Sequence, residues 1–197
     1  MLPFIFANAL LITNLLAPTT EVCGTLGYPE YSSYQQAIEN SQELVVSGPA
    51  IDASRGIGIY IPEFIWPVAN DRMGEGFGIP RPETNSIHMG LDLFPGEGTE
   101  IMSATDGIVI KVEEGTGSYG YMVEIFDGYQ YSTLYAHMLA DSFAAYGISV
   151  GTLVKQGQVI GLVGDTGRST APHLHFEIKD FGVQIDPMPI MQKYAIG

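Results

Sequence analysis

From Phe64 onward, short runs rich in β-branched and aromatic residues recur along the chain, separated by glycine, aspartate and asparagine. The runs lie too close together for crossover helices to join them, so neighbouring strands are expected to run antiparallel. The pattern predicts a mostly β fold with a short helical turn at Ala140–Tyr146. The predicted strands are Thr99–Ser103, Gly107–Glu113, Tyr121–Phe126, Tyr131–His137, Val159–Val163 and His173–Ile178.

The N-terminal part of the chain has a different composition. Residues Leu2–Ala17 are largely apolar, and Ser33 with Gln36 fits the capping box found at helix starts. We therefore expect an N-terminal segment over residues 1–60, with one or two helices, followed by a β domain over residues 61–197. The apolar stretch is shorter than the roughly 20 residues of a membrane span. A signal or membrane anchor, a buried packing helix and the edge of a longer protein all remain open.

The charge balance excludes one class of partner. Acidic residues outnumber basic residues by 22 to 8, for a formal net charge of -14. Nucleic-acid binding needs a basic footprint, so it is not expected. The single cysteine, Cys23, cannot form a disulfide within the chain.

All four histidines fall in three short motifs. Catalytic zinc takes three protein ligands from histidine and acidic residues and keeps a fourth position for water, whose pKa falls to roughly 7. One zinc ion would explain all the histidines and one aspartate together. The motifs are His88-Met-Gly-Leu-Asp92, Tyr135-Ala-His137 and His173-Leu-His175.

Each motif alone also has an ordinary structural explanation, such as polar residues on a half-buried strand or a hydrogen-bonded strand end. The spacing of His173 and His175 places both imidazoles on one face of a strand, where one binds the metal beside its neighbour. Glu177 continues that face and is expected to support a ligand. The helical His-Glu-x-x-His motif is absent, so the general base is expected to be a histidine.

A second pattern concerns the fold. Residues Gly151–Gly164 are similar to the turn pattern of biotin and lipoyl carrier domains, which are compact β-sandwich hybrids. Such carriers hold the cofactor on a lysine at a hairpin tip. The nearest tip, Gly164–Gly167, has no lysine, which disfavours a carrier module.

Residues from about 65 to 190 resemble the lysostaphin-type, or LytM-like, zinc metallopeptidases, which are cell-wall endopeptidases. The resemblance covers about two thirds of the chain, and its pieces occur in the family's order. They are Trp66-Pro-Val, Gly76–Arg81, His88–Asp92, Ala104–Gly107, Tyr135–His137, Gly164–Gly167, Pro172–Glu177 and Asp186-Pro187.

The resemblance implies roles for the motif residues. His88, Asp92 and His175 would bind one Zn²⁺, and His137 and His173 would be the catalytic pair. It further implies an antiparallel β-sheet, sandwich-hybrid domain that hydrolyses peptide bonds in peptidoglycan stems or cross-links. The location would be extracellular, in the cell envelope, or on a phage virion.

The resemblance leaves open which group stabilises the oxyanion, whether the protein is catalytic and in which setting, and whether it is latent. Many members carry an oxyanion-stabilising tyrosine before the first motif, and Pro80–Asn85 contains none. Some relatives are catalytically silent activators of other wall hydrolases, and others are wall-piercing lysins on phage tails. Latency is a further hypothesis, with Cys23 or Asn40 filling the fourth zinc position.

Overall fold

The structure is a computed structural model that describes residues 63–69, 72–115 and 117–196. The expected N-terminal segment lies outside these ranges, together with its apolar stretch, its capping box and both latency candidates. In the described part of the chain, no helix combines the length and the apolar character needed to cross a membrane.

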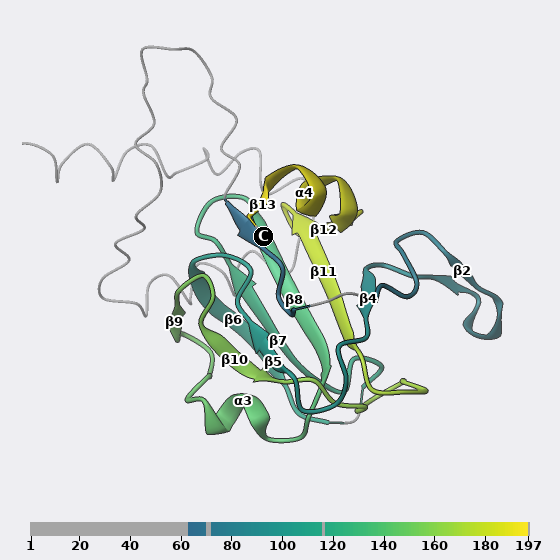
Figure 1. The fold of residues 1–197 in the computed structure, drawn as a ribbon, viewed down its shortest axis with the longest axis horizontal. Coiled ribbons are helices and arrows are strands. Elements are labelled where there is room, and N and C mark those ends of the chain that lie inside the picture. Colours follow the sequence, from purple (N-terminus) through teal and green to yellow (C-terminus); the bar gives the residue numbers. More distant parts are fainter. Residues whose placement is uncertain (1–62, 70–71, 116, 197) are drawn as a thin grey trace, which may run out of the picture. The chain divides into compact units, whose positions relative to one another are not determined.

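A central antiparallel sheet forms the body of the domain (Figure 1). Its strand order is β12-β11-β8-β7-β6-β9, and β4 pairs with β11 beside β12. Antiparallel pairing follows from the short connections, as the sequence predicts. The strands are β4 (Leu91–Leu93), β6 (Gly107–Glu113), β7 (Tyr121–Phe126), β8 (Tyr131–Met138), β9 (Leu153–Val154), β11 (Leu174–Asp180) and β12 (Val183–Ile185).

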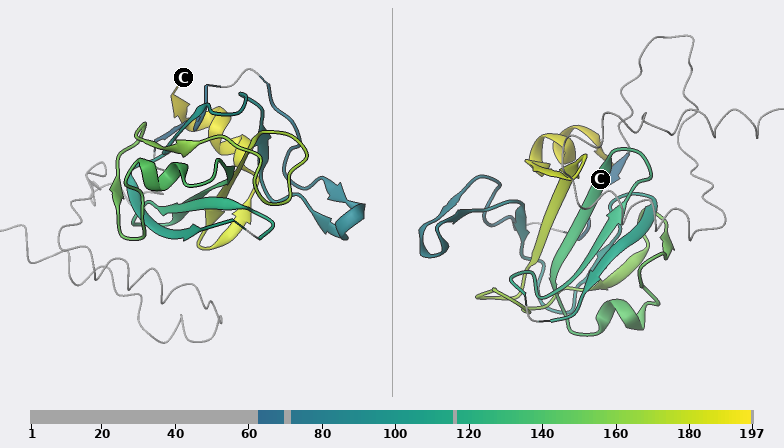
Figure 2. Two further views of the ribbon diagram at one scale, coloured as in Figure 1. Left: turned by 90° about the horizontal axis from the view of Figure 1, so that it is seen from below. Right: turned by 180° about the vertical axis from the view of Figure 1, so that it is seen from behind.

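Smaller elements surround this sheet. A β2–β3 hairpin, with a short 3-10 turn (Pro82–Thr84) at its tip, projects away from the domain body (Figure 2). β5 and β10 pair antiparallel, whereas β1 and β13 pair in parallel. These elements are β1 (Phe64–Ile65), β2 (Pro80–Arg81), β3 (Ser86–Ile87), β5 (Glu100–Met102), α3 (Ser142–Ala145), β10 (Val159–Leu162), α4 (Pro187–Tyr194) and β13 (Ala195–Ile196).

The two faces of the central sheet differ in chemistry. One face of β11 contributes Leu174, Phe176 and Ile178 to the main hydrophobic core, which also includes residues of β5 and β10. Full burial of each such side chain stabilises the fold by about 1.5–3 kcal/mol. Because side chains alternate along a strand, His175 and Glu177 project from the opposite face. We call this opposite face, with its polar side chains, the site face.

The mostly antiparallel β fold is confirmed. β6 and β7 have the predicted bounds, β8 continues to Met138, and β11 begins one residue later than predicted. The sequence analysis assigned no helix to α4, which begins with Pro187 and carries a second proline at Pro189. Proline is tolerated in a first helical turn, where the missing N–H has no intrahelical partner.

Candidate metal centre

Sheet register brings Asp92 and His175 together. In the antiparallel pair of β4 and β11 they lie directly opposite each other, and His175 Nδ1 is 2.9 Å from Asp92 Oδ1. Gly90 permits this approach, because a Cβ on Gly90 would lie 2.4 Å from the Phe176 carbonyl oxygen. Strand pairing thus places a carboxylate and an imidazole at one point of the site face.

His88 reaches the same point from the end of the β2–β3 hairpin. Its Nε2 lies 2.9 Å from His175 Nδ1 and 3.0 Å from Asp92 Oδ1. One atom from each of the three side chains falls within 4.8 Å of the others, and all three residues are buried. This cluster can hold a metal ion.

The tautomers of both imidazoles follow from their other contacts. His88 Nδ1 lies 2.8 Å from the Gly76 carbonyl oxygen, which only accepts, so Nδ1 carries the proton. His175 Nε2 similarly donates to Glu177 Oε1 at 3.0 Å. The two nitrogens that face each other therefore carry lone pairs, next to a carboxylate. Only a cation between them removes the repulsion, and two nitrogens plus one carboxylate oxygen suit zinc.

The electrostatics of the cluster are strongly coupled. Burial alone would raise the pKa of Asp92, but hydrogen bonds with His173, His175 and His88 hold it far below its usual range. Burial opposes protonation of His175, yet the contacts with Asp92 and Glu177 raise its pKa. Without a metal, a proton on His175 is thus the cation that the cluster favours.

An irregularity in β8 turns His137 onto the site face. Tyr135 points into the hydrophobic core, so regular alternation would send His137 there as well. Instead, the register between β7 and β8 shifts by one residue, and His137 adopts a left-handed φ of 59°. Its ring then lies 5.8 Å from that of His175. Bulges are known to redirect side chains next to active sites.

His137 and His173 lie beside the cluster, with the Nδ1 atom of each engaged by a backbone carbonyl. His137 Nδ1 donates to the Thr166 carbonyl at 2.7 Å, and His173 Nδ1 donates to the Ala171 carbonyl at 2.8 Å. Each ring therefore keeps Nε2 as its basic atom, and His173 Nε2 lies 3.6 Å from Asp92 Oδ1. Burial lowers the pKa of His137 to about 4, so its ring is neutral at pH 7.

The structure thus brings together His88, Asp92, His137, His173 and His175, the five residues singled out from the sequence. Glu177 lies beside them as expected. Their catalytic and ligand roles stay predictions.

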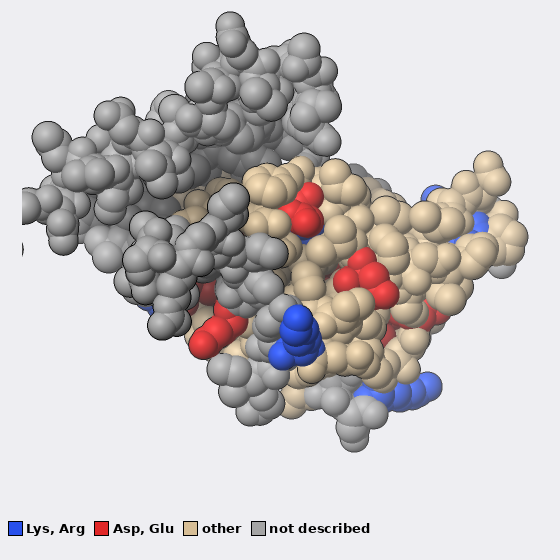
Figure 3. Space-filling view, turned by 90° about the horizontal axis from the view of Figure 1, so that it is seen from above, with Lys and Arg blue, Asp and Glu red and all other residues tan. Residues whose placement is uncertain are grey.

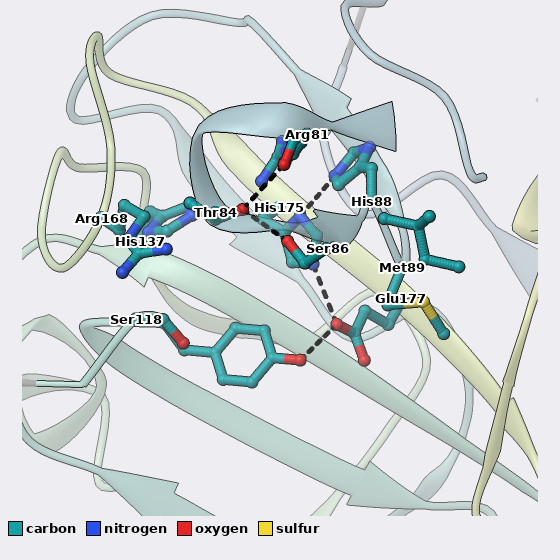
Figure 4. A pocket seen from close by; sticks show the side chains of 12 residues that line it. Arg81, Thr84, Ser86, His88, Met89, Ser118, His137, Arg168, His175 and Glu177 are labelled. Carbon is teal, nitrogen blue, oxygen red and sulfur yellow. Dashed lines mark hydrogen bonds and ion pairs between the residues drawn. The ribbon is translucent and has the colours of Figure 1, made fainter. Parts of the chain in front are cut away.

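Two further residues support the cluster. Arg81 donates to Asp92 Oδ2 at 3.0 Å, leaving Oδ1 for the imidazoles, and Tyr119 donates to Glu177 Oε1 at 2.6 Å. The sequence marked Arg81 only as part of an entry motif. Tyr119 sits in a glycine-rich loop and carried no signal. Both line the pocket in front of the cluster (Figure 4).

Basic residues are sparse on one face of the domain. On the face drawn in Figure 3, the visible lysine and arginine side chains are separated and form no continuous patch among the described residues.

Comparisons with known proteins identify the family of the chain. Peptidase family M23 matches residues 86–187. DD-carboxypeptidase/endopeptidase Mpg of Neisseria meningitidis is 37% identical over 64% of this chain and 28% of its own length. Lysostaphin of Staphylococcus staphylolyticus is 36% identical over 65% of this chain and 27% of its own length. The chain thus spans little more than a quarter of these relatives.

Solved structures show the same relationship. A zinc-containing peptidase from Vibrio cholerae has a TM-score of 0.56 at 33% identity, covering 64% of this chain and 39% of its own. The catalytic domain of lysostaphin from Staphylococcus simulans has a TM-score of 0.51 at 32% identity, covering 62% and 92%. Because the match to the family covers more than half of its residues, the chain belongs to peptidase family M23.

Proposed function

We propose that this protein is a zinc-dependent endopeptidase that hydrolyses peptide bonds in peptidoglycan stems or cross-links. The observation that carries the proposal is the placement of His88 Nε2 and His175 Nδ1, 2.9 Å apart, with Asp92 Oδ1 2.9 Å from His175 Nδ1. His88 Nε2, Asp92 Oδ1 and His175 Nδ1 would hold one Zn²⁺. The relatives named for peptidoglycan or glycyl-glycine endopeptidase activity support the substrate class.

Zinc in this position would supply a Lewis acid and lower the pKa of a water molecule to roughly 7. The remaining steps belong to the protein. His137 and His173 lie beside the ligands with Nδ1 donating to backbone carbonyls, and Nε2 of one of them accepts the proton of the attacking water. The protonated imidazole then donates to the leaving amine. Arg81 holds Asp92 in the orientation that keeps Oδ1 turned toward the imidazoles.

The arrangement favours an active enzyme over a silent activator. An activator that has lost catalysis has no need for a complete ligand set, for two proton acceptors, or for the strained backbone at His137. A phage-tail lysin would use the same chemistry in a different setting. We place the activity outside the cytoplasm, in the cell envelope or on a virion, because that is where peptidoglycan is reached.

The test is mass spectrometry of the fragments that the full-length protein releases from purified peptidoglycan, with and without a zinc chelator. Chelator-sensitive release of peptides identifies both the enzyme and the bond. Failure of the folded, zinc-loaded protein to release fragments from several wall types would refute the proposal.

Site variants separate metal binding from proton transfer. Asp92→Ala and His175→Ala are expected to lose both zinc and activity. His137→Ala and His173→Ala are expected to keep zinc and lose turnover by about 10²-fold or more. The control is Lys155→Ala, which removes an exposed ion pair with Asp106. Tight zinc binding by Asp92→Ala would contradict the ligand assignment.

A further inference from the structure

The loop that precedes β11 carries an arginine on a rigid backbone. Arg168 N donates to the Ser118 carbonyl at 2.9 Å, and Thr166 Oγ1 donates to the Met138 carbonyl at 2.7 Å. Gly167 packs so closely that a Cβ there would lie 2.3 Å from Gly120 N. The loop therefore contacts the segment just before β7 and the end of β8. These contacts fix its position relative to His137.

The side chain of Arg168, unlike its backbone, is not held by hydrogen bonds to the described residues. It is exposed and lines the same pocket as His137 and His175 (Figure 4). Within the described part of the chain, its guanidinium group makes no hydrogen bond or ion pair. Arg81, across the same pocket, instead bonds to Glu75 at 2.8 Å and to Asp92 at 3.0 Å.

The described carboxylates around the pocket are already paired with groups other than Arg168. Asp92 is paired with Arg81, and Glu177 accepts hydrogen bonds from His175 and Tyr119. A zinc ion would add two further positive charges. Among the described residues, the guanidinium group of Arg168 is therefore not needed to neutralise a carboxylate of the pocket. Its position is notable in a chain with only four arginines and a net charge of -14.

We propose that Arg168 binds a carboxylate of the peptide substrate and is a specificity-determining residue. A guanidinium group matches a carboxylate through two parallel hydrogen bonds. The protein then selects peptides that carry an acidic group close to the scissile bond, over uncharged peptides such as glycine bridges. The selection among cleaved peptides rests on the proposed function, whereas the binding of a carboxylate rests on the position of Arg168 alone.

The inference is tested with two pairs of synthetic D-alanyl stem peptides and the full-length, zinc-loaded protein. The members of a pair differ only in one group, a free carboxylate or a carboxamide. One pair places this group on the acyl side of the scissile bond and the other on the amine side. In one pair, wild type should favour the carboxylate about ten-fold in kcat/KM.

Variants assign that preference to the side chain. Arg168→Gln should abolish it by raising KM for the carboxylate peptide, with kcat and the carboxamide peptide little changed. Arg168→Lys should retain part of it, because lysine keeps the charge without the planar fork. Lys155→Ala loses a charge away from the pocket and should keep the full preference. Equal losses on both members of a pair, or no preference in wild type, would overturn the inference.

A binding measurement separates this inference from the proposed function. Fluorescence anisotropy with labelled peptides reports affinity for the zinc-loaded protein whether or not cleavage occurs. If wild type cleaves no peptide but binds the carboxylate member more tightly through Arg168, only the endopeptidase proposal fails. If it binds both members equally, the inference fails, whatever the outcome of cleavage.

Discussion

Gly90→Ala is expected to weaken zinc binding without removing any ligand. The added Cβ would lie 2.4 Å from the Phe176 carbonyl oxygen, 3.0 Å from His175 Cε1 and 3.1 Å from Glu177 Cγ. The nearest of these is a backbone atom in the middle of β11, which has little freedom to yield. Strand β4 must therefore move away from β11 at the point where Asp92 faces His175.

The size of the movement follows from the contact distance. Real Cβ contacts essentially never fall below 3.0 Å, so a separation of 2.4 Å requires a displacement of at least 0.6 Å. Zinc–ligand distances tolerate only about 0.2 Å. We expect zinc affinity to fall by about 10- to 100-fold, as when ligand orientation is disturbed. Overpacking should also cost about 1–3 kcal/mol in the free energy of unfolding.

Competition titration against a chromophoric chelator measures the affinity, and urea denaturation of the metal-free protein measures the stability. Gly76→Ala is the matched control, since it also lies beside His88 but its Cβ would meet nothing within 4 Å. Wild-type zinc affinity in Gly90→Ala, or an equal loss in Gly76→Ala, would refute the argument that strand approach sets the ligand geometry.

Three further predictions concern pH and buried polar groups. His175 has a pKa raised above 6.5, so its contribution to metal-free stability is complete below 6.5 and is lost as pH rises through that pKa. Zinc bound at this site would replace the proton. Its affinity should therefore rise with pH over the same window, and calorimetry in buffers of differing ionisation enthalpy should report the release of about one proton. Asp127→Ala removes an acceptor of three backbone N–H groups. It should lower the free energy of unfolding by about 2–3 kcal/mol, measured by urea denaturation. Asp127→Asn keeps an acceptor oxygen and should lower it by less. Tyr135→Phe removes the hydroxyl that accepts from the buried Ala104 N–H at 2.7 Å. It should lower the free energy of unfolding by about 1–3 kcal/mol. An unchanged unfolding midpoint would contradict this.

The strands were predictable because most are short runs rich in β-branched and aromatic residues, bounded by turn residues. Leu174, Phe176 and Ile178 alternate with His175 and Glu177, so both the strand and its polar face follow from a period of two. Four histidines in three motifs then indicated the residues of the site. Their assembly could not be deduced in the same way, because it depends on the register between strands far apart in sequence.

His137 shows where pattern reasoning ends. Counted from Tyr135, its position belongs to the core face, and only the one-residue irregularity in β8 turns it toward His175. Such a bulge leaves little trace in a single sequence. The sequence marked Arg81 only as part of a family motif and did not mark Arg168, since a solvated arginine and one aimed at a pocket look alike in sequence. Their difference appears only through Glu75 and Asp92, which engage Arg81 alone.

The pairing of β4 with β11 also has a consequence for folding. Asp92 and His175 are 83 residues apart, and His88 and His175 are 87 apart, so the ligands meet only after a long loop has closed. Contacts of this sequence separation form slowly, because chain entropy is lost before they contribute stability. An ion bound to such late contacts lowers the unfolding rate and leaves the folding rate nearly unchanged. In this protein, zinc would therefore act on the lifetime of the folded domain and not on how quickly it is reached.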